Sequence, residues 1–123
     1  MRIEIALLIA FAVVLAGCAD SAAKEAAAIT GGDPGRGAAA IGKYGCGACH
    51  QIKGISGAQG KVGPALAGIK ERMYVAGVIE NTPENITRWI EHPKTIDEKT
   101  AMPELGVTPQ EATDIAAYLY SQK

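Results

Sequence analysis

The pattern of apolar and polar residues divides the chain into a leader, a tether and a helical domain. Residues Ile5 to Leu15 form a continuous apolar run of eleven. Such a run is shorter than the roughly 20 residues that cross a bilayer as a helix, but it is typical of an export-signal core. Residues 18–33 are rich in Ala and Gly with scattered charges. They predict a flexible tether, partly helical around residues 24–28, that reaches on the order of 20 Å.

Two segments combine a helix start signal with apolar residues at helical spacing. Asp33 as N-cap and Pro34 in the first turn predict a helix that runs to about Tyr44. Thr82 followed by proline predicts a second helix, which ends before Pro93. The inward face of this second helix consists of Ile86, Trp89 and Ile90.

The last predicted helix has the clearest signal. Thr108 and Glu111 have the spacing of a capping box. The apolar stripe behind it consists of Ala112, Ile115, Ala116 and Leu119. Gly37 and Tyr118 are candidates for a close crossing of the first helix on the last. The sequence therefore predicts one all-α domain over residues 34–123.

Composition and charge fit a single small domain. About 106 of the 123 residues remain if residues 1–17 are a cleaved signal peptide, which is enough for one core. The one Phe lies inside the predicted signal, which leaves one Trp and four Tyr. A core this poor in large side chains would be stabilised by a buried prosthetic group. The net charge of −1 gives no reason to expect nucleic acid. Basic residues prevail over 36–72 and acidic ones beyond 80, which either orients a protein partner or belongs to the solvated surface.

The residues with the most specific chemistry are Cys46, Cys49 and His50. They form the C-x-x-C-H pattern of c-type haem attachment. One helical turn places the two thiols to form thioethers with the haem vinyl groups, and the adjacent imidazole can bind the iron. A redox dithiol and half of a zinc site are the alternatives. A zinc site would need more ligands, and only Cys18 and His92 remain; no βαβ pattern surrounds the motif as it would a thioredoxin-type dithiol.

The third cysteine lies at the end of the apolar run. Leu15-Ala16-Gly17-Cys18 is similar to the lipobox of bacterial lipoprotein signals, in which the cysteine is lipidated and becomes the mature N-terminus. Two or three acyl chains would anchor the domain firmly. We therefore predict a lipid anchor at the cell membrane, facing the periplasm or extracytoplasmic space. The alternatives are an uncleaved anchor or an ordinary secretory signal with an incidental cysteine.

A low-spin iron bound by His50 needs a second strong ligand, for which the sequence offers three candidates. For Met73 the alternative is gap-filling in the core, the usual use of a methionine. His92 lies at a helix C-terminus, where a histidine usually faces water. Met102 lies in an irregular stretch between two helices and is followed by Pro103, which stiffens the backbone. Since such a loop can present a thioether to iron, we predict Met102 as the distal ligand.

Two further residues are candidates for supporting the cofactor. The Pro64 carbonyl can hold the second ring nitrogen of His50, although an ordinary turn explains the same Gly-Pro spacing. Trp89 is either a core residue or a donor from its indole N–H to a haem propionate. The loop 53–63 contains four glycines but neither a preceding strand nor a P-loop lysine-serine pair. It predicts a flexible connection across the haem edge rather than a phosphate site.

Taken in order, these motifs resemble the class I cytochrome c family, small bacterial single-haem domains. The resemblance covers about Pro34 to Tyr120 and rests on Cys46–His50, Gly63–Leu66, Asn81–Asn85 with Trp89 and Ile90, Thr100–Pro103, and Asp114–Leu119. It implies an all-α cytochrome c fold of four or five helices around one covalent haem c. It also implies Pro64 as the carbonyl partner of His50 and Met102 as the distal ligand.

The middle motifs are similar to the cytochrome c domains fused to subunit II of some haem-copper oxidases. This sequence differs in having its own lipobox and no copper-domain pattern. With both axial positions filled there is no open site for a substrate. We therefore expect a membrane-tethered single-electron carrier, not an enzyme, that serves respiratory donor and acceptor proteins, a haem-copper oxidase among the candidates. The alternatives are a tightly bound haem subunit of a respiratory oxidase or dehydrogenase complex, and a peroxidase or gas-binding haem protein.

Overall fold

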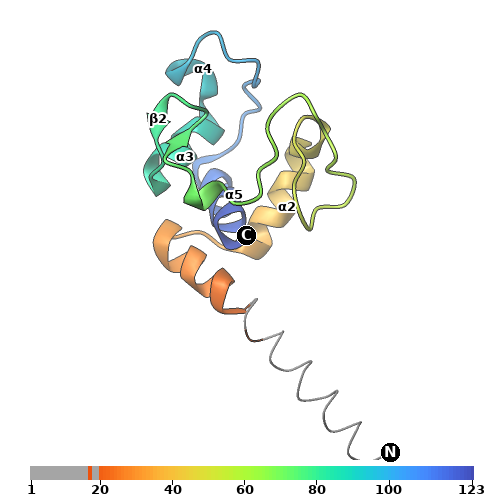
Figure 1. Cartoon of the computed structure of the whole chain (residues 1–123), viewed down its shortest axis with the longest axis vertical. Coiled ribbons are helices and arrows are strands. Elements are labelled where there is room, and N and C mark those ends of the chain that lie inside the picture. The colour runs from red at the N-terminus through yellow and green to blue at the C-terminus, as the bar shows by residue number, and fades with distance from the viewer. Residues whose placement is uncertain (1–16, 18–19) are drawn as a thin grey trace, which may run out of the picture.

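The computed structural model describes residue 17 and residues 20–123, and within them the chain is mainly helical (Figure 1). Residues 20–30 are helical. The elements that follow are α2 (Pro34–Tyr44), η1 (Cys46–Ala48), η2 (Ile69–Glu71), β1 (Tyr74–Val75), β2 (Ile79–Glu80), α3 (Pro83–Glu91), α4 (Pro93–Ile96) and α5 (Pro109–Ser121). The all-α prediction is confirmed. Cys18 and most of the predicted signal peptide lie outside the described residues. None of the helices described is long and apolar enough to span a membrane.

The predicted helix starts are present with their side-chain caps. Asp33 accepts a hydrogen bond from the Arg36 backbone N–H at 2.7 Å. Thr82 and Thr108 accept equivalent bonds at 3.2 and 3.3 Å, each followed by proline in the first turn. These caps satisfy backbone donors that the helix leaves free. Pro93 does not simply end α3, because it also begins the short helix α4.

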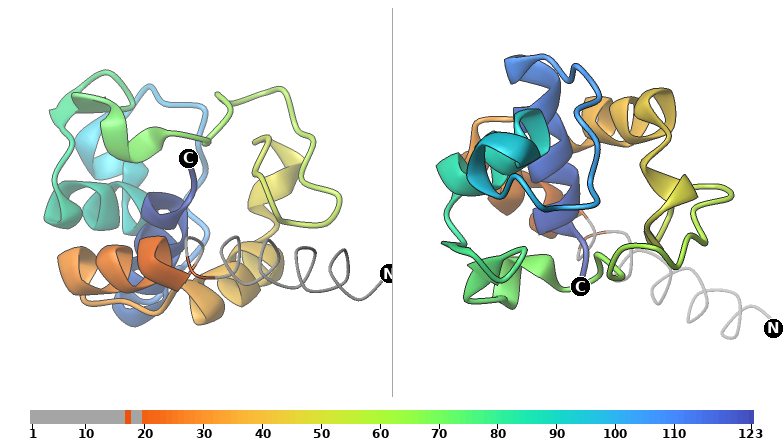
Figure 2. Two further views of the ribbon diagram at one scale, coloured as in Figure 1. Left: turned by 60° about the horizontal axis from the view of Figure 1, so that its bottom comes forward. Right: turned by 90° about the horizontal axis from the view of Figure 1, so that it is seen from above.

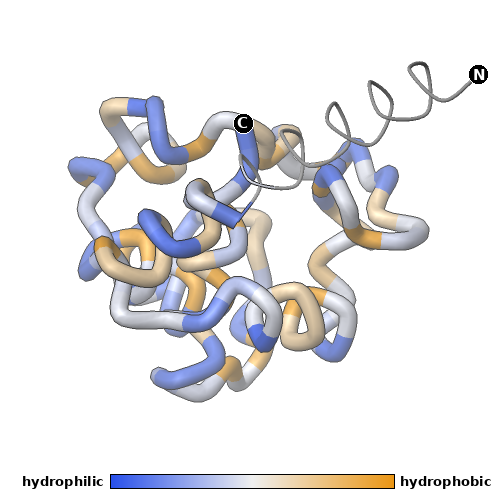
Figure 3. Tube along the Cα trace, turned by 90° about the horizontal axis from the view of Figure 1, so that it is seen from below, coloured by the Kyte–Doolittle hydropathy of each residue, from blue (hydrophilic) through white to orange (hydrophobic). Residues whose placement is uncertain are grey.

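The core lies where α2 and α3 pack on α5. Its most deeply buried side chains include Ile41, Ile86, Ile115 and Leu119, each at most 4% exposed. Figure 3 shows hydrophilic stretches on several outer turns of the trace, with apolar stretches between them. Trp89 is 9% exposed and belongs to this core. The helical spacing in the sequence therefore identified the inward faces correctly.

The α2–α5 crossing is close because Gly37 has no side chain. A Cβ atom at this position would lie 2.0 Å from the Asp114 carbonyl oxygen and 3.0 Å from Tyr118 Cβ. Asp114 itself is 2% exposed and is held by Arg36, whose Nε lies 2.8 Å from Oδ2. This guanidinium, together with the Asp33 backbone N–H, lowers the pKa of Asp114 against the opposing effect of burial. The crossing predicted between Gly37 and Tyr118 is thus present.

The helix over residues 20–30 differs from the flexible tether that composition predicted. Ala26 is 1% exposed and belongs to the core cluster. The Lys70 ammonium lies 2.5 Å from Glu25, and Gly32 sits so close to α5 that a Cβ would lie 2.3 Å from the Thr113 carbonyl oxygen. Figures 1 and 2 show this helix beside α5. Small residues, which suggested flexibility, instead allow close helix packing.

The sequence also did not predict the small hairpin of β1 and β2. Val75 pairs with Ile79 and Tyr74 with Glu80, antiparallel. The turn places Ala76 at φ +51° and Gly77 at φ +74°. Positive φ at both central positions matches the right-handed twist of a two-stranded ribbon. Only Gly77 signals this turn in the sequence.

Gly37→Ala is expected to destabilise the domain by about 3 kcal/mol, because the new methyl group overlaps backbone that cannot move without separating α2 from α5. Thermal unfolding of the two proteins measures the loss. The matched control is Gly42→Ala on the same helix, where a Cβ meets nothing within 4 Å. This control should stabilise α2 by up to about 1 kcal/mol. Equal melting temperatures for Gly37→Ala and the parent would contradict the crossing.

Candidate functional site

The C-x-x-C-H motif lies on a tight turn at the end of α2. Gly45, at φ +68°, ends the helix in a left-handed conformation that glycine adopts without strain. The backbone N–H groups of Cys49 and His50 both donate to the Cys46 carbonyl, at 3.2 and 3.0 Å. This turn places the two cysteines one helical turn apart, with the imidazole immediately after them. Local structure therefore meets the spacing requirement from which the sequence prediction started.

Both cysteines of the motif are free thiols and half-buried. Cys46 packs against the core cluster, and burial raises the pKa of its thiol above the usual value. A reactive redox dithiol depends on the opposite shift, because the thiolate is the nucleophile. The environment of Cys46 is therefore unsuited to the dithiol alternative and compatible with a thiol that is consumed in a thioether.

His50 is oriented by the backbone of the loop that follows. Its Nδ1 lies 2.7 Å from the Pro64 carbonyl oxygen, the contact that the sequence predicted. A carbonyl can only accept, so Nδ1 carries the proton and Nε2 keeps a lone pair for a metal. Gly63 allows this approach, since a Cβ there would lie 2.4 Å from the imidazole Cε1. The arrangement is what a ligating histidine requires.

Two of the four glycines of the loop, Gly60 and Gly63, serve packing rather than flexibility. A Cβ at Gly60 would lie 2.4 Å from the Cys49 carbonyl carbon, and one at Gly47 would lie 2.7 Å from Ala58 Cα. Gly60 N–H donates to the Gly47 carbonyl at 3.0 Å, and Gly63 N–H donates to the Cys49 carbonyl at 2.8 Å. The expected flexible connection is therefore a backbone layer docked on the motif. The spacing of the glycines was the available signal, and its meaning was missed.

The three candidates for the distal ligand lie in different surroundings. Met102 is half-buried and packs against the core cluster. Met73 is 76% exposed. The His92 side chain is 61% exposed and lies 3.4 Å from Glu104. Figure 1 shows the blue loop of residues 97–107 at the same upper end of the molecule as the loop that follows the cysteine motif. Burial thus favours Met102, and its role as a ligand stays a prediction.

The donor set fits a haem better than the other metal site considered. Among residues 17 and 20–123, no three His, Cys, Asp or Glu side chains gather as a metal site. The two thiols and the single oriented imidazole match attachment by thioethers and ligation by one nitrogen. Trp89 is a core residue, which agrees with the first of its two interpretations. A hydrogen bond from its indole N–H to a haem propionate stays a prediction.

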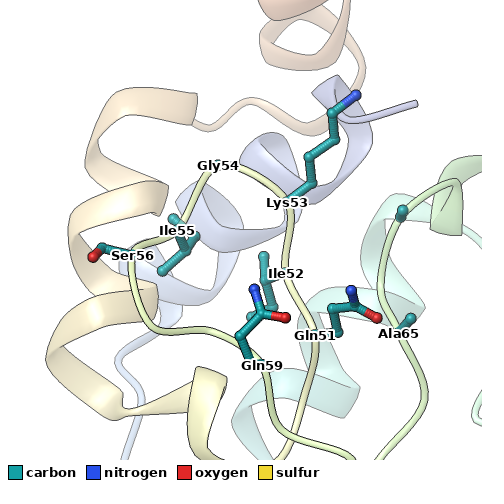
Figure 4. A pocket seen from close by; sticks show the side chains of 9 residues that line it. Gln51, Ile52, Lys53, Gly54, Ile55, Ser56, Gln59 and Ala65 are labelled. Carbon is teal, nitrogen blue, oxygen red and sulfur yellow. The ribbon is translucent and has the colours of Figure 1, made fainter.

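An open cavity of about 710 Å³ lies beside the docked loop (Figure 4). It is lined by residues 51–56, Gln59, Ala65 and Ala67. Figure 4 shows the Gln51 and Gln59 side chains close together in it, and their backbones form an isolated β-bridge. None of the residues predicted to attach or ligate the haem lines this cavity, but five residues of the loop predicted to cross the haem edge do: Lys53, Gly54, Ile55, Ser56 and Gln59. It is an open hollow next to the turn that carries His50.

Comparisons with known proteins agree with this site. Residues 35–123 match the family model for cytochrome c. The cytochrome c oxidase subunit 2 of Alkalihalophilus pseudofirmus is 33% identical over 79 residues, which are 63% of this chain and 22% of that protein. The match thus spans about a fifth of the relative's length. No solved structure matches the chain.

Proposed function

Since the chain belongs to the cytochrome c family, we propose that it is a membrane-tethered carrier of single electrons and not an enzyme. A cytochrome c domain implies haem-based electron transfer. When bound, the haem supplies an iron that changes by one electron between its ferric and ferrous states. In the proposal, one haem c is held by Cys46, Cys49, His50 and Met102.

The residues of the chain have distinct tasks in this proposal. The thiols of Cys46 and Cys49 would each form a thioether with the haem. These two bonds would keep the haem on the protein. His50 offers Nε2 to the iron while Pro64 holds Nδ1 at 2.7 Å, which prevents the imidazole from rotating. The thioether of Met102 completes the ligation and favours the ferrous state relative to a second histidine. The hydrogen bond between His50 and Pro64, beside the cysteine turn, is the observation that carries the proposal.

Tethering is supported by the lipobox-like ending at Cys18, and the structure of residues 20–30 limits its reach. Because this helix is docked on the domain, only the short stretch between Cys18 and residue 20 links it to a lipid. Two residues span at most about 7 Å, compared with the order of 20 Å for a flexible tether of residues 18–33. A lipid-anchored domain would therefore stay close to the bilayer surface.

A second candidate function is a haem subunit fixed within a respiratory complex. It is favoured by the likeness to a protein named as cytochrome c oxidase subunit 2, in which a comparable segment is part of a larger chain. In that case the chain should co-purify with other subunits after extraction in mild detergent. A mobile carrier should be extracted alone.

Fractionation of cells that export the protein tests haem binding and tethering together. We expect the membrane fraction to show the sharp visible bands of a reduced c-type cytochrome, and these bands should disappear and return on cycles of oxidation and reduction. Cys18→Ser should move the same bands to the soluble fraction or block processing. A red protein that is soluble with an unmodified Cys18 would contradict tethering alone, whereas a colourless membrane protein would contradict electron carriage.

A further inference from the structure

One carboxylate connects the end of α2 to the start of α5. Glu111 accepts hydrogen bonds from Tyr44 Oη at 2.5 Å, from Lys43 Nζ at 2.6 Å and from Thr108 Oγ1 at 2.8 Å. Lys43 and Tyr44 are the last two residues of α2, immediately before the turn with the two cysteines. Thr108 closes the loop that carries Met102. Glu111 thus joins the proximal motif to the distal loop.

The carboxylate of Glu111 does not have the contact that its place in the sequence predicts. In a capping box this side chain reaches back to the backbone N–H of the N-cap residue. Here the Thr108 hydroxyl still caps the helix by accepting from the Glu111 N–H at 3.3 Å. The carboxylate, 25% exposed as a side chain, instead bonds to α2. Lys43 first, and then Tyr44 and Thr108, lower the pKa of Glu111 to about 2, so it stays charged at neutral pH.

The contact extends into the loop itself. Tyr44 Oη also lies 3.4 Å from the Gly106 carbonyl oxygen, four residues beyond Met102, and Val107 next to it is 6% exposed. On the N-terminal side of Met102, Lys94 Nζ donates to the Thr100 carbonyl oxygen, and the Met102 N–H donates to Thr100 Oγ1 at 3.2 Å. Glu104, between Met102 and Gly106, also accepts from the Lys94 N–H at 3.1 Å. The Met102 segment is thus a short span between two held ends, one of which is held by Tyr44 and Glu111.

We propose that Glu111 is a positioning residue for the distal ligand: its bond to Tyr44 latches the 97–107 loop against α2 and keeps Met102 on the haem. The inference rests on the proposed function, in which Met102 ligates the iron. Without the latch, the C-terminal end of the loop can move away from α2. The iron then becomes accessible to a small ligand for a larger fraction of the time.

The test uses the haem-loaded full chain with Glu111→Ala, Glu111→Gln and Tyr44→Phe. We expect Glu111→Ala to increase the affinity of the reduced protein for carbon monoxide about tenfold, because the loop loses a hydrogen bond to a charged group. Amide hydrogen exchange in residues 97–107 should accelerate by a similar factor. Tyr44→Phe should act in the same direction, and Glu111→Gln less, because its amide can still accept from Tyr44. The double variant Tyr44→Phe with Glu111→Gln should be non-additive.

The matched control is Glu25→Gln, which breaks the ion pair between Glu25 and Lys70 at 2.5 Å. It should change neither carbon monoxide binding nor hydrogen exchange in the loop. The proposal is overturned if carbon monoxide binding and loop exchange in Glu111→Ala and Tyr44→Phe equal those of the parent. It is also overturned if exchange rises equally throughout α2 and α5, which would show general destabilisation. If Met102→Ala itself leaves carbon monoxide binding unchanged, the ligand assignment fails instead. Glu111→Gln and Tyr44→Phe carry the test if Glu111→Ala does not fold.

Discussion

Replacing both Cys46 and Cys49 by alanine is expected to abolish covalent haem attachment. The two thiols are the only groups of the C-x-x-C-H motif that can form thioethers, and both are free and half-buried on one turn. The core has few large aromatic side chains. A domain that loses the volume of the porphyrin should therefore also fold poorly and accumulate at a low level. The measurement is extraction with acidic organic solvent, which removes haem that is not covalently bound.

Cys18→Ser is the natural control, because it removes the one other cysteine of the chain and should leave the haem on the polypeptide. Each single variant, Cys46→Ala or Cys49→Ala, should retain one thioether and shift the visible bands of the reduced protein. Extraction that strips the colour from the parent protein would show that attachment through these thiols is wrong. It would leave non-covalent haem binding by His50 possible.

Met102→Ala is expected to remove the distal ligand and to change the iron more than any other substitution outside the motif. The weak far-red band that reports a sulfur–iron bond should disappear, and carbon monoxide should bind readily. The reduction potential should fall by on the order of a hundred millivolts, because axial ligands set the potential of a haem. Visible spectroscopy and a redox titration measure these effects.

Met73→Ala and His92→Ala are the matched controls for this assignment. Met73 is 76% exposed and the His92 side chain 61% exposed, so neither change should alter the far-red band or the potential. A far-red band that survives in Met102→Ala but is lost in Met73→Ala would transfer the role to Met73. Survival of the band in all three variants would mean that another ligand, or another conformation of the 97–107 loop, holds the iron.

The features that the sequence determined by itself are those that depend on neighbours a few residues apart. Asp33, Thr82 and Thr108 cap their helices as predicted because an N-cap bond joins residues two or three positions apart. The spacing of Cys46, Cys49 and His50 specifies one turn for the same reason. Helical periodicity likewise identified the faces of α3 and α5 that are buried.

Features that join distant parts of the chain were decided by the tertiary structure. The composition of residues 20–30 suggested a free tether, but Ala26 is buried in the core cluster, Glu25 pairs with Lys70 of η2 and the following Gly32 lies close against α5. The carboxylate of Glu111 keeps the Thr108 hydroxyl as a local partner and also accepts from Tyr44, 67 residues away. Gly60 and Gly63 proved to be contact points only once the loop lay on the motif. Local propensities are similar in many folds, whereas such contacts exist only when the other elements are already in place.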